Sequence, residues 1–223
     1  MAPRFPAPSR QGFVSPFRLI AGLLAVSAFA ADLPLDRLLK QVENRYNHAK
    51  TLQVLFVEQY TPPANIRRTE RGSLLLRKPG RMRWDYTEPK GKLWVSDGKD
   101  WWLYTPADHR AETGKLKESG DLHPLLAFLL GKLDFSKEFR NLKGTPLGPD
   151  MHIVAEPKSD NLPYSAVELV VTPDDHIRQV KVTGFDHSIL EFSLSEEKLD
   201  LPLDPKLFQF KLPPGTILED AGQ

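Results

Sequence analysis

The segment from Leu74 to Tyr104, LLLRKPGRMRWDYTEPKGKLWVSDGKDWWLY, decides the fold class of this chain. It contains all four Trp residues of the sequence, and turn signals divide it into short runs. Lys78-Pro79-Gly80 joins an apolar run to an Arg-rich aromatic run, and Asp97-Gly98 separates two aromatic-rich runs. An Asp-Gly pair between such runs is the strongest short-range signal for a β-hairpin. The segment therefore predicts a meander of short antiparallel strands.

Composition supports a mainly β protein. At 223 residues, with 40% hydrophobic and 26% charged side chains, the chain suits one globular domain with a sizeable core. Its 20 Pro and 14 Gly residues favour many turns. The absence of Cys excludes disulfides, thiolate metal sites and Cys nucleophiles.

The first thirty residues have the pattern of a secretory signal peptide. Three basic residues, Arg4, Arg10 and Arg18, precede an apolar run from Leu19 to Phe29, and the triplet Ala28-Phe29-Ala30 at the end of this run has the small-x-small pattern of a cleavage site. The run is about eleven residues long, too short to cross a bilayer core of roughly 30 Å as a helix, so a retained anchor is the weaker interpretation. We predict cleavage after Ala30, a single mature domain of residues 31–223, and a location outside the cytoplasm.

Charge argues against nucleic acid or an anionic membrane as the main partner. The whole chain has 30 basic and 29 acidic side chains, and the mature chain would stay close to neutral. Basic residues do cluster between Pro63 and Arg83, where they alternate with apolar ones. This pattern fits a solvated strand face or a docking surface for an acidic partner protein better than a nucleic-acid site. The cluster consists of Arg67, Arg68, Arg71, Arg77, Lys78, Arg81 and Arg83.

Two further segments have helical patterns. Apolar residues from Leu35 to Ala49 recur at helical spacing, which predicts an amphipathic helix packed on a sheet, with or without a ligand cavity beneath it. The stretch Asp121 to Leu130, with Asp121 as N-cap, predicts a short helix that is apolar nearly all round. It suits a plug or lid over an apolar interior, and a buried structural helix fits the pattern equally well.

The rest of the chain has strand patterns. Thr51 to Tyr60 alternates with a period of two, and both of its faces are partly apolar, which predicts strands covered on both sides. Counting onward gives about eleven strands with short connections, so we expect an up-and-down antiparallel sheet that curls toward a barrel. The later strands are predicted at Phe135–Phe139, Met151–Ala155, Ala166–Thr172, Ile177–Thr183 and Ile189–Leu194, with a hairpin turn at Pro173-Asp174-Asp175.

No motif for catalysis or metal binding stands out. The six His residues are scattered, and the sequence has no H-E-x-x-H, G-x-S-x-G or phosphate-binding Gly-rich motif. Neighbouring acids such as Glu196-Glu197 lie on opposite faces of a strand and make a poor catalytic pair. We therefore expect no cofactor, no metal and no enzyme activity, although dispersed catalytic residues would leave no motif.

Several of these segments together resemble one family. The residues that carry the likeness are Phe56, Glu58, Gln59, Gly72, the run Arg77 to Trp84, Leu93, Val95 to Gly98, Trp102 and Tyr104 to Pro106. They are similar to those of the periplasmic outer-membrane lipoprotein carriers, the LolA family, most specifically between Gly72 and Pro106. The likeness covers most of the predicted mature chain.

The resemblance implies a fold and a function. The fold would be an unclosed antiparallel β-barrel with a helical lid, whose apolar interior holds the acyl chains of a lipoprotein. Such a monomeric periplasmic carrier would receive its cargo from an inner-membrane ABC transporter and deliver it to an outer-membrane receptor. Residues expected at the cavity, lid and mouth are Leu74, Leu76, Lys78, Met82, Trp84, Trp102, Leu122 and Leu126.

Two positions depart from the family pattern. Carriers of this family usually have Arg where this chain has Lys78, an inward residue that hydrogen-bonds to the lid and holds it shut. Lys keeps the charge but lacks the planar five-donor fork, so such a latch would be weaker or differently made. Met82 replaces an aromatic residue near the docking mouth and offers an adaptable apolar contact instead.

Two other functions remain open from the sequence. A lipid-binding or envelope-stress-sensing module could share the same barrel, and it would carry free lipid rather than acylated protein. A periplasmic hydrolase with dispersed catalytic residues would require a pocket with converging polar groups and perturbed pKa values.

Overall fold

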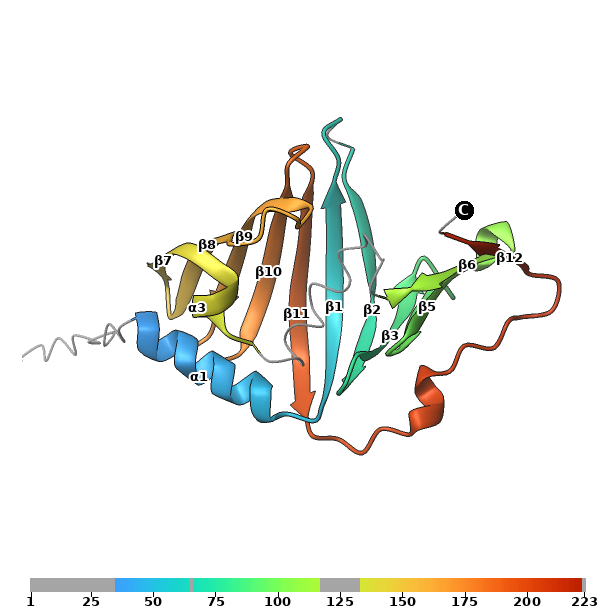
Figure 1. The fold of residues 1–223 in the computed structure, drawn as a ribbon, viewed down its shortest axis with the longest axis horizontal. Helices are drawn as coiled ribbons and strands as arrows, with labels where there is room; N and C mark the ends of the chain where they lie inside the picture. The colour runs from blue at the N-terminus through green and yellow to red at the C-terminus, as the bar shows by residue number, and fades with distance from the viewer. Residues whose placement is uncertain (1–34, 65, 117–132, 222–223) are drawn as a thin grey trace, which may run out of the picture. The chain divides into compact units, whose positions relative to one another are not determined.

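A computed structural model of the chain describes residues 35–64, 66–116 and 133–221. These residues belong to one structural unit, Asp32–Gln223. Most of them form strands of a single sheet, and the helical elements are few and short apart from α1 (Figure 1). The helical elements are α1 (Leu35–His48), η1 (Pro106–Asp108), α3 (Phe135–Glu138) and η4 (Pro205–Phe208).

Within the described residues, twelve strands form one sheet in the order β12-β6-β5-β4-β3-β2-β1-β11-β10-β9-β8-β7. Sequence neighbours pair within two antiparallel meanders, which join where β1 pairs with β11. The strands are β1 (Thr51–Thr61), β2 (Arg68–Arg77), β3 (Arg81–Glu88), β4 (Leu93–Asp97), β5 (Asp100–Thr105), β6 (Arg110–Lys115), β7 (Phe139–Leu147), β8 (Asp150–Pro157), β9 (Tyr164–Val171), β10 (Ile177–Gly184), β11 (Ile189–Leu199) and β12 (Ile217–Asp220).

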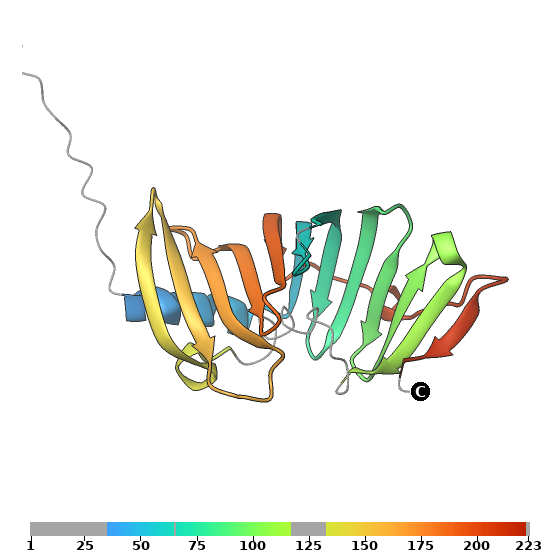
Figure 2. The same cartoon turned by 90° about the horizontal axis from the view of Figure 1, so that it is seen from above.

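The sheet does not close into a barrel in the part of the chain that the structure describes. β7 and β12 occupy its two ends and lie far apart (Figure 2). The last strand, β12, adds to β6 in parallel, and all the other pairings are antiparallel. The predicted unclosed antiparallel sheet is therefore confirmed, with one strand more than the sequence count.

The predicted turns fall where the sequence placed them. The Lys78-Pro79-Gly80 turn joins β2 to β3, the Asp97-Gly98 turn joins β4 to β5, and Pro173-Asp174-Asp175 joins β9 to β10. The requirement for Gly at position 72 comes from packing, because a Cβ there would lie 2.1 Å from the Asp85 carbonyl oxygen of β3. Only Gly permits this close approach of the two strands at the register shift between Arg71 and Gly72.

One face of the sheet, the inner face, carries the apolar core. Cross-strand partners share a face, so the row Val54, Leu74, Trp84, Trp94 and Leu103 runs across five neighbouring strands. The row continues through Phe192 of β11 into the β7–β11 half of the sheet. Burial of these side chains is the main source of stability available to a single-layer sheet.

The opposite, outer face is crossed by a segment that we call the C-terminal strap, Leu201–Phe210. Arg77 and Arg83 donate to the strap carbonyls of Leu203 and Leu207 at 2.8 Å and 3.0 Å. Phe208 of the strap is only 1% exposed. The strap thereby covers apolar outer-face residues of β3–β5 and leads into β12 at the sheet edge (Figure 1).

Helix α1 matches the predicted amphipathic helix, and its Leu38, Leu39, Val42 and Tyr46 are buried. Polar contacts anchor its C-terminal end to the sheet. The Tyr46 hydroxyl donates to Glu197 Oε2 at 2.6 Å and accepts from the Ile177 backbone N–H at 3.0 Å. Arg45 also donates to Glu197, whose side chain is only 7% exposed. Burial, and then the nearby Glu197 carboxylate, raise the pKa of Tyr46, which therefore stays protonated at physiological pH.

One predicted strand is wrong. Phe135–Phe139 was expected to be extended, but residues Phe135–Glu138 form the short helix α3, and β7 begins at Phe139. The Asp134 side chain accepts a hydrogen bond from the Lys137 N–H and caps the helix. The apolar residues Phe135 and Phe139 have the spacing of one helical turn as well as that of a strand face, and the cap decides between them.

Two predictions fall outside the described residues. These are the helix Asp121–Leu130 and the signal peptide with its cleavage site after Ala30, and both stay predictions. Among the helices that the structure does describe, none is long and apolar enough to cross a membrane.

We predict that Tyr46→Phe destabilises the protein. The substitution keeps the ring but leaves a buried carboxylate oxygen of Glu197 and a buried N–H without this partner, at a cost of about 1–3 kcal/mol. Urea unfolding followed by far-UV circular dichroism measures the loss. Tyr104→Phe is the control, because the Tyr104 hydroxyl makes no hydrogen bond within the described residues. Equal unfolding midpoints for the two variants would contradict the anchoring role.

Candidate functional site

Four of the eight expected site residues lie together on the inner face. Leu74, Leu76, Met82 and Trp84 are each at most 1% exposed. They come from β2 and β3, the strands joined by the Lys78-Pro79-Gly80 turn, and pair directly as Leu74 with Trp84 and Leu76 with Met82. These four side chains form an apolar wall. A hydrocarbon chain could pack against such a wall in place of the protein side chains that now cover it.

Trp84 lies at the centre of an aromatic cluster that ties the two halves of the sheet together. Its ring meets Phe56 of β1 edge-on at 4.9 Å between centroids, and Phe192 of β11 at 5.5 Å. Phe56 in turn meets Tyr86 at 5.2 Å. Because edge-to-face pairs add to the energy of burial, this cluster fixes the geometry of the inner wall.

Trp102 lies on the outer face. Consecutive strand residues point to opposite faces, so Trp101 and Trp102 cannot share one. Trp101 stacks on Trp94 on the inner side, whereas the Trp102 ring stacks on Phe210 of the strap at 5.9 Å. The sequence pattern did not distinguish the two Trp residues. The remaining pair, Leu122 and Leu126, lies outside the described residues.

Lys78 contacts helix α1. Its ammonium group donates to the Tyr46 carbonyl oxygen at 3.2 Å and also to the carbonyl oxygen of Asn47. These are carbonyls in the last turn of a helix, where the helix leaves acceptors unsatisfied and carries partial negative charge. Burial lowers the pKa of Lys78, and the Asp200 carboxylate offsets part of that effect. The β2 end is thus joined to the helix that covers part of the inner face.

A group of polar residues lies farther along the inner face, and the sequence singled out only one of them, Glu58. Glu58 is 8% exposed and pairs across the strands with Glu70. Glu70 forms an ion pair with Lys92, and the Lys92 ammonium lies 4.4 Å from the centre of the Tyr86 ring. The Tyr86 hydroxyl lies 3.4 Å from Glu58 Oε2. The apolar wall is therefore bounded by charged and hydroxyl groups at this end of β1–β3.

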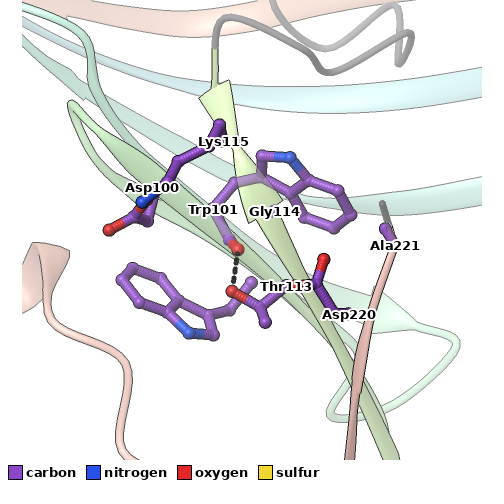
Figure 3. Close-up of a pocket in the computed structure, with 8 residues that line it drawn as sticks. Asp100, Trp101, Thr113, Gly114, Lys115, Asp220 and Ala221 are labelled. Atoms are coloured by element: carbon purple, nitrogen blue, oxygen red, sulfur yellow. Dashed lines mark hydrogen bonds and ion pairs between the residues drawn. The ribbon is translucent and has the colours of Figure 1, made fainter. Parts of the chain in front are cut away.

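A separate hollow of about 420 Å³ opens at the β5–β6–β12 edge (Figure 3). The Trp101 indole lies against Gly114, where a Cβ would be 3.1 Å from the ring, and the Thr113 hydroxyl donates to the Trp101 carbonyl. Asp100 and Lys115 form an ion pair at its rim. Its lining is more polar than the inner wall, and it contains no arrangement typical of catalysis. No cluster of His, Cys, Asp and Glu suited to a metal ion occurs among the residues that the structure describes.

Comparison with known protein families shows which family this sequence matches. The family described as outer membrane lipoprotein carrier protein LolA matches residues 47–211, which is most of the chain. The chain belongs to the LolA family. The match spans the inner wall, Lys78 and the strap.

Individual proteins with similar sequences are lipoprotein carriers as well. The chain is 27% identical over 206 residues to an outer-membrane lipoprotein carrier protein of Sodalis glossinidius, covering 92% of this chain and 96% of the relative. It is 28% identical over 204 residues to the same kind of protein from Azotobacter vinelandii, covering 89% and 94%. An uncharacterized conserved protein of Thermus thermophilus shares the fold, with a TM-score of 0.51, 13% identity and coverage of 84% and 99%.

We predict that the two faces respond differently to loss of a Trp. Trp84→Ala removes a fully buried ring from the centre of the aromatic cluster and should cost about 3–5 kcal/mol. Trp102→Ala removes a half-buried ring and its stack on Phe210, which should cost about 1–2 kcal/mol. Urea unfolding of both variants measures the difference. Equal losses, or a larger loss for Trp102→Ala, would contradict the placement of Trp84 at the centre of the core.

Proposed function

We propose that this protein is a periplasmic carrier that binds the acyl chains of lipoproteins against its inner face. The observation that carries this proposal is the continuous apolar face of an unclosed sheet in a chain that matches the lipoprotein-carrier family. An open sheet covered by a helix is also an ordinary structural arrangement, so the family match is what makes this face a candidate for binding hydrocarbon. On such a face, contacts between protein side chains can be replaced by contacts with a hydrocarbon chain. This suits a ligand that must enter and leave.

The energetics explain why such a ligand needs a carrier. Each methylene moved from water to an apolar surface gains about 0.8 kcal/mol, so acyl chains with tens of carbons would cost on the order of tens of kcal/mol in water. Unassisted diffusion through an aqueous compartment is therefore negligible. A protein that substitutes its own apolar surface for the membrane removes most of this cost.

We further propose the two ends of the route. The cargo is released from the inner membrane by an ABC-type complex and is passed to an outer-membrane receptor. Transfer then needs only a modest difference in affinity between successive apolar sites, since hydrocarbon stays covered throughout. The protein acts as a monomer, with no cofactor and no chemical step.

Lys78 is the proposed latch of the carrier. Its hydrogen bonds to the Tyr46 and Asn47 carbonyls join the β2–β3 turn to α1. A lysine makes point contacts that are easier to exchange than the planar, multidentate contacts of an arginine. We infer that this latch opens more readily than the Arg latch usual in the family.

The carrier function predicts extraction of lipoproteins from membranes. The purified protein, added to spheroplasts, should bring lipoproteins of the inner membrane into solution as one-to-one complexes, detected by size-exclusion chromatography and immunoblotting. Leu103→Glu, which places a charge on the inner face, should reduce extraction by at least roughly tenfold, because burying that charge beside hydrocarbon is unfavourable.

Leu75→Glu is the matched control, because Leu75 is also half-buried but lies on the outer face. It should extract as well as the unmodified protein. Failure to release any lipoprotein, or equal loss in both variants, would contradict the proposal. Recovery of free lipid without acylated protein would favour a general lipid-binding module.

The latch predicts a change in the dynamics of α1. Lys78→Leu removes both hydrogen bonds to the helix end, so amide exchange in the last turn of α1 should accelerate on the order of tenfold, as expected for the loss of about 1.4 kcal/mol. Lys78→Arg should slow it. Hydrogen–deuterium exchange with mass spectrometry measures both variants. Unchanged exchange in Lys78→Leu would assign Lys78 to solvation of the turn and not to a latch.

A further inference from the structure

A second hollow lies where α1, β1, β2, β11 and the C-terminal strap meet, and we call it the basic hollow. Its volume is about 680 Å³. It adjoins the latch, because Lys78 lines it. Its lining residues are His48, Lys50, Thr51, Arg77, Lys78, Asp200, Leu201, Pro202 and Leu203.

Hydrogen bonds hold the frame of the basic hollow in place. The Lys50 N–H donates to Asp200 Oδ1 at 2.7 Å, and the Thr51 hydroxyl donates to the Leu201 carbonyl at 2.7 Å. The Asp200 N–H donates to the Thr51 carbonyl at 3.0 Å, and Arg77 ties the wall to the strap through Leu203. The hollow is therefore built by contacts between segments far apart in the sequence, and a ligand would find it already formed.

Positive charge predominates in this hollow. Lys50, Arg77 and Lys78 face one acid, Asp200, whose carboxylate already accepts from the Lys50 backbone. In the described part of the chain, none of the three cationic side chains forms an ion pair with a carboxylate. A concave, partly apolar surface lined by one sign of charge attracts the opposite charge strongly. The hollow is thus suited to an anionic group.

Its size and its apolar side favour a peptide over a small ion. Hollows of roughly 300–1,000 Å³ accept a ligand of many atoms, well beyond one phosphate. Leu201, Pro202 and Leu203 of the strap offer apolar contacts beside the cations. A short segment that alternates acidic and apolar side chains would satisfy both parts of the surface.

We propose that the basic hollow binds an acidic, partly apolar peptide segment of a docking partner, and that a carboxylate of this segment takes Lys78 from the carbonyls of Tyr46 and Asn47. A charged acceptor makes stronger hydrogen bonds than a neutral carbonyl, so the exchange is favourable. Release of the helix end would then couple docking to opening of α1. This consequence rests on the proposed carrier function, whereas the binding itself does not.

The test uses the full-length mature protein and a fluorescently labelled, N-acetylated hexapeptide in which three Asp alternate with three Leu. Fluorescence anisotropy at low salt should show saturable binding. The same peptide with Asn in place of Asp should bind at least about tenfold more weakly, because the charge-assisted contacts are gone. Equal affinity for the two peptides would overturn the proposal.

Two charge reversals localise the site. Lys50 and Lys206 are both exposed, and each donates its backbone N–H to an Asp side chain, Asp200 and Asp204 respectively. Lys50→Glu should weaken peptide binding about tenfold or more, whereas Lys206→Glu, outside the hollow, should leave it unchanged. Equal weakening by both would show general electrostatic attraction and would overturn the site. Inorganic phosphate that displaces the peptide at equal concentration would show a simple anion site and would also overturn it.

The coupling to α1 has its own measurement. Saturating peptide should accelerate amide exchange in residues 44–48 of the unmodified protein and should have no such effect in Lys50→Glu. Bound peptide without any change in exchange would overturn the release of Lys78. None of these measurements involves a lipoprotein, so their failure leaves the extraction result intact, and a failed extraction leaves peptide binding measurable.

Discussion

The structure depends on one constraint: the apolar inner face of a single, unclosed sheet needs a cover. Twelve strands in the described residues form one layer, and no second sheet packs against it. The aromatic cluster around Trp84 and Phe192 makes the inner face continuous across the junction of β1 with β11. Helix α1 covers part of this face, and the strap covers part of the other. Leu74, Leu76, Met82 and Trp84 of the inner face are at most 1% exposed, so a hydrocarbon ligand would have to replace packing that now covers them.

The wall is held by apolar contacts, and helix α1 adds polar contacts to its own apolar packing. Tyr46 joins α1 to Glu197 and Ile177, and Lys78 joins it to the β2–β3 turn. Apolar packing has no preferred direction, whereas hydrogen bonds are directional and can be exchanged for others one at a time. A carrier requires both properties, because its wall must accept varied hydrocarbon and its cover must open at defined places. The basic hollow is lined by Lys78, whose hydrogen bonds are among the polar contacts that hold the cover.

Local features of the sequence predicted much of this fold. The hairpins at Lys78-Pro79-Gly80 and Asp97-Gly98 and the apolar stripe of α1 are short-range signals, and the structure has all of them. Contacts between distant segments left no such signal. The Tyr46–Glu197 hydrogen bond joins residues 151 positions apart, and the strap meets Arg77 across 126 positions. Parallel addition of β12 to β6 and the outward direction of Trp102 depend on the same long-range packing. Helix α3 was missed because a capping Asp outweighed an ambiguous apolar spacing.

As a carrier, the protein would hold the acyl chains of a lipoprotein against its inner face. Native mass spectrometry of the carrier, purified from the periplasm of cells that accumulate a lipoprotein, tests it most directly. The carrier function predicts a species with one carrier and one lipoprotein, which dissociates to the free carrier and a protein bearing its acyl chains. A carrier that holds only free lipid, or that stays empty while lipoprotein accumulates, would contradict it.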